Sequence, residues 1–252
     1  MKRFVWKCTF SYVAVLVVLS AVYGMFHRKV LTLWPAETKP RIYTDAREGG
    51  FSTAEFLESS GAVGISAVLN SGLYHPHAGI EFPLRSGLES LSAGGVDFSS
   101  MDSVEITFRA NADVVLVLYA TDPAVSKPGD PLSFRPLRMD IPATRSYSRS
   151  RLPLSGLEPS ALWLDMRGLE QDGNLYLENI RRVAVETGKG SLLGLPTEIE
   201  ILKLEFLGTN GTLVGACLSI LILATIIYIW SVAKYGKRSE NPKKNGAGVG
   251  ER

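Results

Sequence analysis

The stretch VEITFRANADVVLVLYA, residues 104–120, contains two successive strand patterns. In residues 104–109 apolar side chains alternate with polar ones, which is typical of a strand with one buried face. Residues 114–120 are apolar on both faces, which suits a central strand that is covered on both sides or that carries a ligand-binding face. Two strands so close together in the sequence favour a β-sheet domain.

The same pattern of period two extends through the middle of the chain, with little helical periodicity. Further strands are predicted at residues 63–69, 78–84, 134–141, 175–177, 182–186 and 198–206. Turn-forming pairs such as Gly49-Gly50 and Gly94-Gly95 separate them. This spacing predicts a mainly β fold, an antiparallel jelly-roll sandwich. One short helix is expected at residues 53–59, with Ser52 as its N-cap.

Two uncharged apolar blocks flank this region. The first, residues 8–26, holds about 19 residues, which as a helix reach about 28 Å, close to the hydrocarbon thickness of a bilayer. A cleaved signal peptide is the alternative, because residues 1–7 are basic. The second block contains a predicted span at residues 211–233, for which a buried core helix is the alternative. The sequence thus predicts a jelly roll between two transmembrane helices.

The placement of Lys and Arg predicts the orientation of these spans. Both the tip, residues 1–7, and the tail, residues 234–252, are basic, so both termini are expected in the cytoplasm. Residues 30–205 then form an extracytoplasmic domain, periplasmic or extracellular, on a bacterial inner membrane. The tail is polar and Gly-rich, so we expect it to be disordered.

The composition excludes several classes of function. Lys and Arg number 27 against 25 Asp and Glu, a formal net charge of +2, so no nucleic acid is expected as a partner. The only cysteines, Cys8 and Cys217, lie in the apolar blocks, which leaves the middle region without a disulfide or a thiolate metal site. No metal and no cofactor are expected. A Gly-x-Ser-x-Gly motif and a phosphate-binding glycine loop are also missing from the sequence, so we expect no enzyme.

Three segments together resemble a known type of domain. They are GAVGISAVLNSGLYHPHAGIEFPL (residues 61–84), VDFSSMDSVEITFRA (residues 96–110) and NLYLENIRRVAVETGKGSLLGLPTEIEILKLEFLG (residues 174–208). Their order is similar to that in galactose-binding-like jelly rolls of family 11 carbohydrate-binding modules and of complex I intermediate-associated proteins. Similar domains form the periplasmic sensor part of some bacterial membrane histidine kinases and helix-turn-helix regulators. Here only a short tail follows the second block, so we expect any signal to pass to a separate protein.

The resemblance implies a carbohydrate-like ligand, which such modules bind with aromatic rings flanked by planar polar groups. The cluster Tyr74, His75 and His77 fits this chemistry, although Pro76 between the histidines is equally suited to a simple turn with solvated side chains. The histidine pair does not predict zinc, because no third ligand stands nearby in the sequence. Tyr119 could end a binding face or cap the core.

A basic stretch adds further candidates. Arg135 and Arg138, with Arg145, Arg149 and Arg151 after them, would suit an acidic polysaccharide or a phospholipid headgroup, or form a solvated loop. Trp163 lies among apolar residues and is expected in the core.

The sequence therefore predicts a non-catalytic, membrane-anchored sensor or accessory subunit. Its extracytoplasmic jelly roll would bind a carbohydrate-like ligand or a partner protein. The alternative is a structural docking component of an envelope transport or polysaccharide-synthesis complex.

Overall fold

The structure is a computed structural model that describes residues 2–35, 39–84, 95–127, 129–170 and 172–239. The chain forms two compact units. One is the segment Val30–Gly208, and the other joins the described residues at the two ends of the chain. Each unit is described separately below.

The unit formed by the chain ends consists of two helices, α1 (Lys2–Phe26) and α3 (Gly211–Ser239). Both are long and apolar enough to cross a membrane, over Val5–Phe26 and Gly211–Lys234. Polar side chains join them: the hydroxyls of Tyr12 and Thr225 lie 2.9 Å apart, and the rings of Tyr12 and Tyr228 stack with centroids 4.9 Å apart. In hydrocarbon such paired hydroxyls avoid the cost of an unsatisfied polar group.

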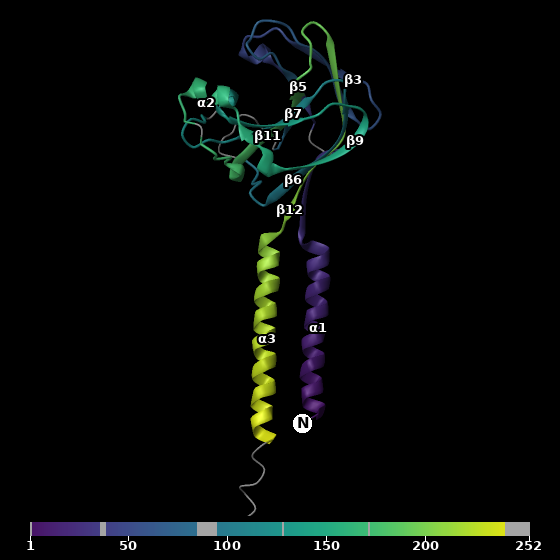
Figure 1. The fold of residues 1–252 in the computed structure, drawn as a ribbon, viewed down its shortest axis with the longest axis vertical. Coiled ribbons are helices and arrows are strands. Elements are labelled where there is room, and N and C mark those ends of the chain that lie inside the picture. Colours follow the sequence, from purple (N-terminus) through teal and green to yellow (C-terminus); the bar gives the residue numbers. More distant parts are fainter. Residues whose placement is uncertain (1, 36–38, 85–94, 128, 171, 240–252) are drawn as a thin grey trace, which may run out of the picture. The chain divides into compact units, whose positions relative to one another are not determined.

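The second unit is a sandwich of two antiparallel sheets (Figure 1). Sheet I has the order β3-β4-β12-β6-β9, with β1 also paired to β12, and sheet II has the order β10-β8-β7-β11-β5-β2. The strands of sheet I are β1 (Arg28–Trp34), β3 (Thr53–Leu57), β4 (Val63–Val68), β6 (Met101–Ala110), β9 (Thr144–Pro153) and β12 (Pro196–Thr209). The strands of sheet II are β2 (Arg41–Thr44), β5 (Ala78–Pro83), β7 (Val114–Ala120), β8 (Arg135–Ile141), β10 (Glu158–Pro159) and β11 (Ile180–Thr187). This confirms the predicted jelly-roll sandwich.

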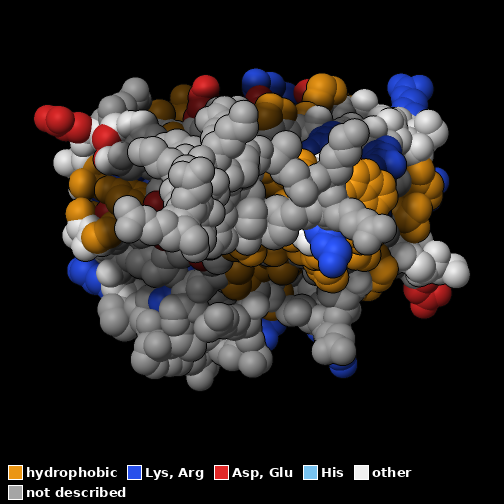
Figure 2. Space-filling view, turned by 90° about the horizontal axis from the view of Figure 1, so that it is seen from below, with side chains coloured by type: hydrophobic (Ala, Val, Ile, Leu, Met, Phe, Trp, Pro, Cys, Tyr) orange, Lys and Arg blue, Asp and Glu red, His pale blue; other side chains and the backbone are white. Residues whose placement is uncertain are grey.

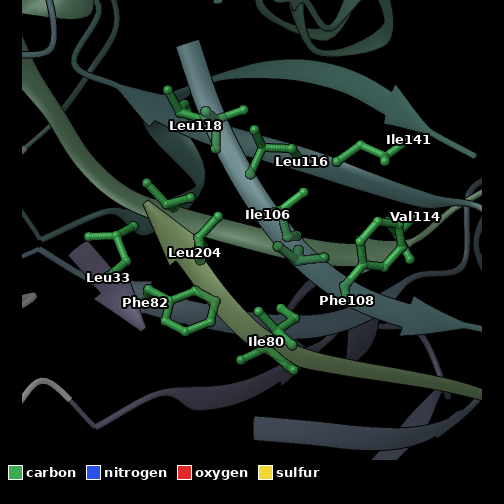
Figure 3. Packing of buried hydrophobic residues seen from close by; sticks show 14 of the residues in the cluster. Leu33, Ile80, Phe82, Ile106, Phe108, Val114, Leu116, Leu118, Ile141 and Leu204 are labelled. Atoms are coloured by element: carbon green, nitrogen blue, oxygen red, sulfur yellow. The ribbon is translucent and has the colours of Figure 1, made fainter. Parts of the chain in front are cut away.

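A single apolar core fills the space between the sheets. Figure 3 shows Ile80, Leu116 and Leu118 of sheet II together with Ile106 and Leu204 of sheet I. All five side chains are buried. Because successive side chains of a strand point to opposite faces, this core accounts for the alternation in the sequence.

The predicted strands at residues 63–69, 78–84, 104–109, 114–120, 134–141, 182–186 and 198–206 are confirmed by β4, β5, β6, β7, β8, β11 and β12. These strands form the centre of both sheets. The sequence pattern missed β1, β2, β9 and β10, and the helix α2 (Ala161–Arg167). Ser160 is the N-cap of that helix, and its side chain accepts a hydrogen bond from the Trp163 N–H. Gly168 is the C-cap, with a left-handed φ of 64°.

The helix predicted at residues 53–59 is wrong, because Thr53–Leu57 is strand β3, paired with β4. Ser52 does not cap a helix. Its hydroxyl donates to the buried Asp45 carboxylate at 2.7 Å and accepts the Asn70 N–H at 3.2 Å. These hydrogen bonds of Ser52 therefore connect the residue before β3 to the preceding loop.

The strand predicted at residues 175–177 is also wrong. Tyr176 has a left-handed φ of 47°, which a strand does not allow, and a 3-10 turn follows at Leu177–Asn179. The Tyr176 ring instead lies 4.9 Å from the Arg135 guanidinium. This segment packs against sheet II rather than extending it.

We expect the fragment Val30–Gly208 to fold without the helices, because the apolar core is formed within it. The shorter fragment 41–205 should be less stable, since it lacks Leu33 of β1 and Phe206 of β12, both buried in that core. Circular dichroism and urea denaturation of both fragments test this prediction. Equal stability of the two fragments would contradict the role of β1 in the sandwich.

Candidate functional site

The face of sheet II that points away from the core carries a distinct set of side chains. The side chains that point into the core identify the inward face of each strand. They are Ile80, Val183, Leu116 and Leu137, so the residues next to them along each strand point outward. The strand register aligns these outward residues in three rows: Tyr43, Gly79, Glu186, Val115 and Asp140; then Arg41, Glu81, Ala184, Val117, Arg138 and Glu158; then Pro83, Arg182, Tyr119 and Pro136. We call this set the outer face of sheet II.

Small apolar side chains form the centre of this face. Val115, Val117 and Ala184 pack with Tyr43 and Tyr119 into a cluster that is separate from the main core. Tyr119 is half-buried, whereas Val117 and Ala184 are fully buried. The result is an apolar floor with two tyrosines beside it.

Glu186 is the first of two buried carboxylates beside this floor, with 1% of its side chain exposed. The Tyr43 hydroxyl donates a hydrogen bond to its Oε2, and Arg138 Nη2 lies 2.6 Å from its Oε1. Burial, followed by the charge of Glu186, raises the pKa of Tyr43 well above its usual value. The same two causes raise the pKa of Tyr119 to about 12, so both tyrosines are neutral hydrogen-bonding groups at ordinary pH.

Glu81 is the second buried carboxylate and has no exposed side-chain surface. Its Oε2 accepts from Arg182 Nη1 at 2.7 Å and from Arg47 Nη1 at 3.2 Å. Within the described residues of this face, Glu81 Oε1, Arg182 Nε and Glu186 Oε1 are buried and have no hydrogen-bond partner, although Glu186 Oε1 lies within ion-pair distance of Arg138. The Arg182 guanidinium lies 3.7 Å from the centroid of the Tyr119 ring.

This face combines apolar, charged and hydroxyl side chains. An apolar floor with carboxylates, guanidinium groups and hydroxyls around it can hold a ligand that has both apolar and polar parts. In the described part of the chain, no three His, Cys, Asp or Glu side chains lie close enough together to hold a metal ion.

The structure brings three of the predicted site residues to this region. Tyr119 and Arg138 lie on the outer face of sheet II, and the His77 ring lies at its edge, 5.8 Å from the Tyr43 ring. Tyr74 and His75 precede β5 in an exposed loop, where Tyr74 is 86% exposed and its ring packs edge-on against His75. The His75 carbonyl lies 3.1 Å from His77 Nδ1, but the side chains of Tyr74 and His75 make no contact with the three rows among the described residues.

Arg135 points to the opposite side of sheet II from Arg138. It is 2% exposed, and its guanidinium contacts Asp122 at 2.9 Å, Asp172 at 2.5 Å and the Asn174 carbonyl at 2.8 Å. Its donors are engaged by the protein itself. We therefore leave Arg135 out of the proposed site.

Trp163 is half-buried in α2 and lies outside the main core, contrary to expectation. Its Nε1 donates to the Leu132 carbonyl at 3.2 Å, so the indole packs beside an exposed loop. Its apolar neighbours in the sequence had suggested a core position.

The remaining arginines of the basic stretch lie on the outer face of sheet I, in β9. Arg149 pairs with Glu105 at 2.6 Å, whereas Arg145 lines an open hollow of about 290 Å³. The other residues that line this hollow are Arg109, Ala110, Asn111, Glu198 and Glu200. Charges of both signs line this hollow, and Figure 2 shows Lys and Arg as well as Asp and Glu side chains around the margin of the view. This is the pattern of a solvated surface.

Sequence patterns missed Tyr43, Glu81, Arg182 and Glu186. Part of this set could have been predicted from the sequence of β11, where Arg182, Ala184 and Glu186 alternate with valines. An amphipathic strand beside the apolar β7 would have placed them on the same face as Tyr119. No comparable pattern identifies Tyr43 in the four-residue β2.

The two sheets and their order define the chain as a jelly-roll domain flanked by two apolar helices. No protein-family model matches the sequence, and no curated protein matches it either. Solved structures similar to the chain include the family 11 carbohydrate-binding module of the cellulosomal cellulase Lic26A-Cel5E of Clostridium thermocellum, with a TM-score of 0.50 at 14% identity over 73% of this chain and 95% of that one.

The family 11 module from Clostridium thermocellum in complex with a β-1,3-1,4-mixed-linked tetrasaccharide is similar to the same degree. Its TM-score is 0.50 at 14% identity, and the match covers 73% of this chain and 96% of that one. A family 30 carbohydrate-binding module gives a TM-score of 0.42 at 8% identity, over 72% of this chain and 99% of that one. The likeness to family 11 modules that the sequence indicated is thus found in the fold.

Proposed function

We propose that the chain is a non-catalytic, membrane-anchored protein whose jelly-roll domain binds a glycan on the outer face of sheet II. The observation that carries this proposal is the apolar floor of Val115, Val117 and Ala184 between two tyrosines and the buried Glu81 and Glu186. A sugar ring offers a C–H face to apolar and aromatic groups, and hydroxyls to carboxylates and guanidinium groups. Solved modules of similar fold are carbohydrate-binding modules, which supports the choice of ligand.

A pair of matched tyrosine variants tests this proposal. Tyr119→Ala should weaken glycan binding about tenfold or more, because it removes a ring beside the floor. Tyr147→Ala should leave binding unchanged, since Tyr147 lies in β9 of sheet I and its hydroxyl donates to Glu200. Binding is measured on a glycan array and by calorimetry with the full chain in detergent.

Circular dichroism melts of both variants, together with the milder Tyr119→Phe, establish that the proteins remain folded. If Tyr147→Ala weakens binding as much as Tyr119→Ala does, the site is not on the outer face of sheet II.

We further propose that both helices span a bacterial inner membrane, that both termini are cytoplasmic and that the jelly roll is periplasmic or extracellular. The two apolar helices and the basic residues beyond them support this arrangement. Reporter fusions at Asn111 and at Arg252 should report opposite compartments. Fusions that report the same compartment would contradict the two-span arrangement.

A docking role in an envelope complex is the second candidate function. Exposed apolar side chains favour it: Phe51 is 67% exposed, and Leu192 and Leu193 are 61% and 56% exposed. The Gly194 N–H donates to the Leu69 carbonyl at 2.8 Å, which holds the loop of these leucines against the end of β4. An array on which the full chain binds no glycan would favour this role. In either role, we propose that a separate membrane or cytoplasmic protein receives the signal or the docking contact.

A further inference from the structure

Four exposed apolar side chains lie in two loops at one end of the sandwich. We call them the loop patch: Phe51 before β3, and Leu192, Leu193 and Leu195 between β11 and β12. Each of the four is more than half exposed. The strand register brings the two loops to the same place, because Val68 of β4 pairs with Thr53 on one side and with Pro196 on the other. Neighbouring exposed apolar side chains of this kind mark an interaction surface.

The loop between β4 and β5 holds the other two loops in position. The Asn70 Nδ2 donates to the Phe51 carbonyl at 2.8 Å, and a Cβ on Gly72 would come within 2.7 Å of the Phe51 ring. The Gly194 N–H donates to the Leu69 carbonyl, also at 2.8 Å. The exposed side chains are therefore carried by a connected backbone rather than by independent loops.

The three loops carry almost no charge. Asp, Glu, Lys and Arg are missing from residues 49–53, 69–76 and 190–197. The charged residues Glu48, Lys189 and Glu198 stand at the borders of these ranges, and Lys189 is paired with Asp140 at 2.6 Å. An apolar centre without charges inside a polar margin is the composition of an interface between identical subunits.

We propose that the loop patch binds the same patch of a second copy of this chain, in a dimer with a twofold axis normal to the membrane. The proposal rests on the two-span arrangement proposed above. Two copies anchored in one membrane in the same direction hold the loop patch at the same height, whatever angle the sandwich makes with the membrane. A twofold contact brings each residue close to its own counterpart, so an uncharged patch can pair with itself without repulsion.

The bilayer that holds the spans is a poorer occupant of the loop patch. Strand β12 begins at Pro196, next to Leu195, and its 14 residues extend about 45 Å before α3 begins at Gly211. The loop patch and the second apolar helix thus follow opposite ends of that strand. This separation favours a protein surface outside the membrane, and a second copy presents one at the matching height.

Exchange of charge at Leu193 tests the contact. Full-length copies with a donor or an acceptor fluorophore at the C-terminus are mixed in vesicles of phosphatidylethanolamine and phosphatidylglycerol, where energy transfer measures association. The unaltered chain should associate. Leu193→Asp and Leu193→Lys should each weaken association about tenfold or more, because like charges meet across the twofold axis. Vesicles that contain one variant of each sign should regain association, since the charges then attract.

Met166→Asp is the matched control, because Met166 is an exposed apolar residue of α2, outside the loop patch. It introduces the same charge as Leu193→Asp and should leave association unchanged. Melting curves verify that all variants are folded. Leu193→Asp should bind glycan as the unaltered chain does, since Leu193 lies outside the three rows of the outer face of sheet II.

An unaltered chain that does not associate would overturn the dimer. Leu193→Asp that associates as strongly as the unaltered chain would overturn the assignment of the contact to the loop patch. Loss of association in both charged variants without recovery in their mixture would overturn the pairing of the patch with itself. The glycan array and the reporter fusions test the proposed function separately, so its failure is distinguishable from failure of the dimer.

Discussion

Replacing Asp122 with alanine is expected to lower the free energy of unfolding by about 3–5 kcal/mol, because it leaves a buried guanidinium without its buried counter-ion. Arg135 is 2% exposed and Asp122 is 1% exposed, with Nη2 and Oδ2 at 2.9 Å. The second carboxylate near Arg135, that of Asp172, is 38% exposed and cannot replace a partner held inside the protein. Urea denaturation of the full chain in detergent measures the effect.

Two further variants distinguish this cause from general damage. Asp102→Ala removes the partner of exposed Arg151, 3.6 Å away, and should change stability little. Combining Asp122→Ala with Arg135→Met removes both charges and should recover part of the loss, since a buried pair can be replaced by apolar side chains at low cost. A loss no larger than that of Asp102→Ala would show that the Arg135 pair is solvated.

Phe206→Ala should destabilise the sandwich by about 3–5 kcal/mol, the range for deleting a large buried aromatic side chain. Phe206 and Phe98 have no exposed surface, and their rings meet edge to face with centroids 4.7 Å apart. The substitution leaves a cavity between β12 and the segment before β6, and it also removes a favourable aromatic pair. Urea denaturation also measures this effect.

Phe51→Ala provides the control for this prediction, because the Phe51 side chain is 67% exposed and its loss creates no buried cavity. Equal stability of Phe206→Ala and Phe51→Ala would contradict the placement of Phe206 in the core.

The sequence predicted the centre of the fold because the central strands alternate strongly or are apolar on both faces. The strands that the sequence pattern did not predict have a physical reason in common: they lack a repeating apolar pattern. Strand β9 reads TRSYSRSRLP, in which Ser148 and Ser150 alternate with exposed arginines and Leu152 alone packs against the core, so period two in hydrophobicity is absent. Strands β2 and β10 have four and two residues, too few to show any period. Pairing with a neighbour, rather than local pattern, makes them strands.

The candidate site was predictable only in part. Tyr119 and Arg138 lie in strands that the pattern identified, so their direction could be derived. Tyr43 meets Glu186 across 143 residues of sequence, and only the order of strands in sheet II brings the two together. Tyr74 and His75 were predicted from composition, yet they lie in the exposed loop before β5 and not in the three rows of this face.

Methyl resonances report directly whether glycan binds on the outer face of sheet II. The full chain in lipid nanodiscs, with labelled Val and Ala methyl groups, is titrated with each glycan that is positive on the array. Binding on this face should shift the methyl resonances of Val115, Val117 and Ala184, which form the floor, and should leave those of Ala54 and Val68 of sheet I unchanged. Shifts confined to the residues of sheet I would contradict it.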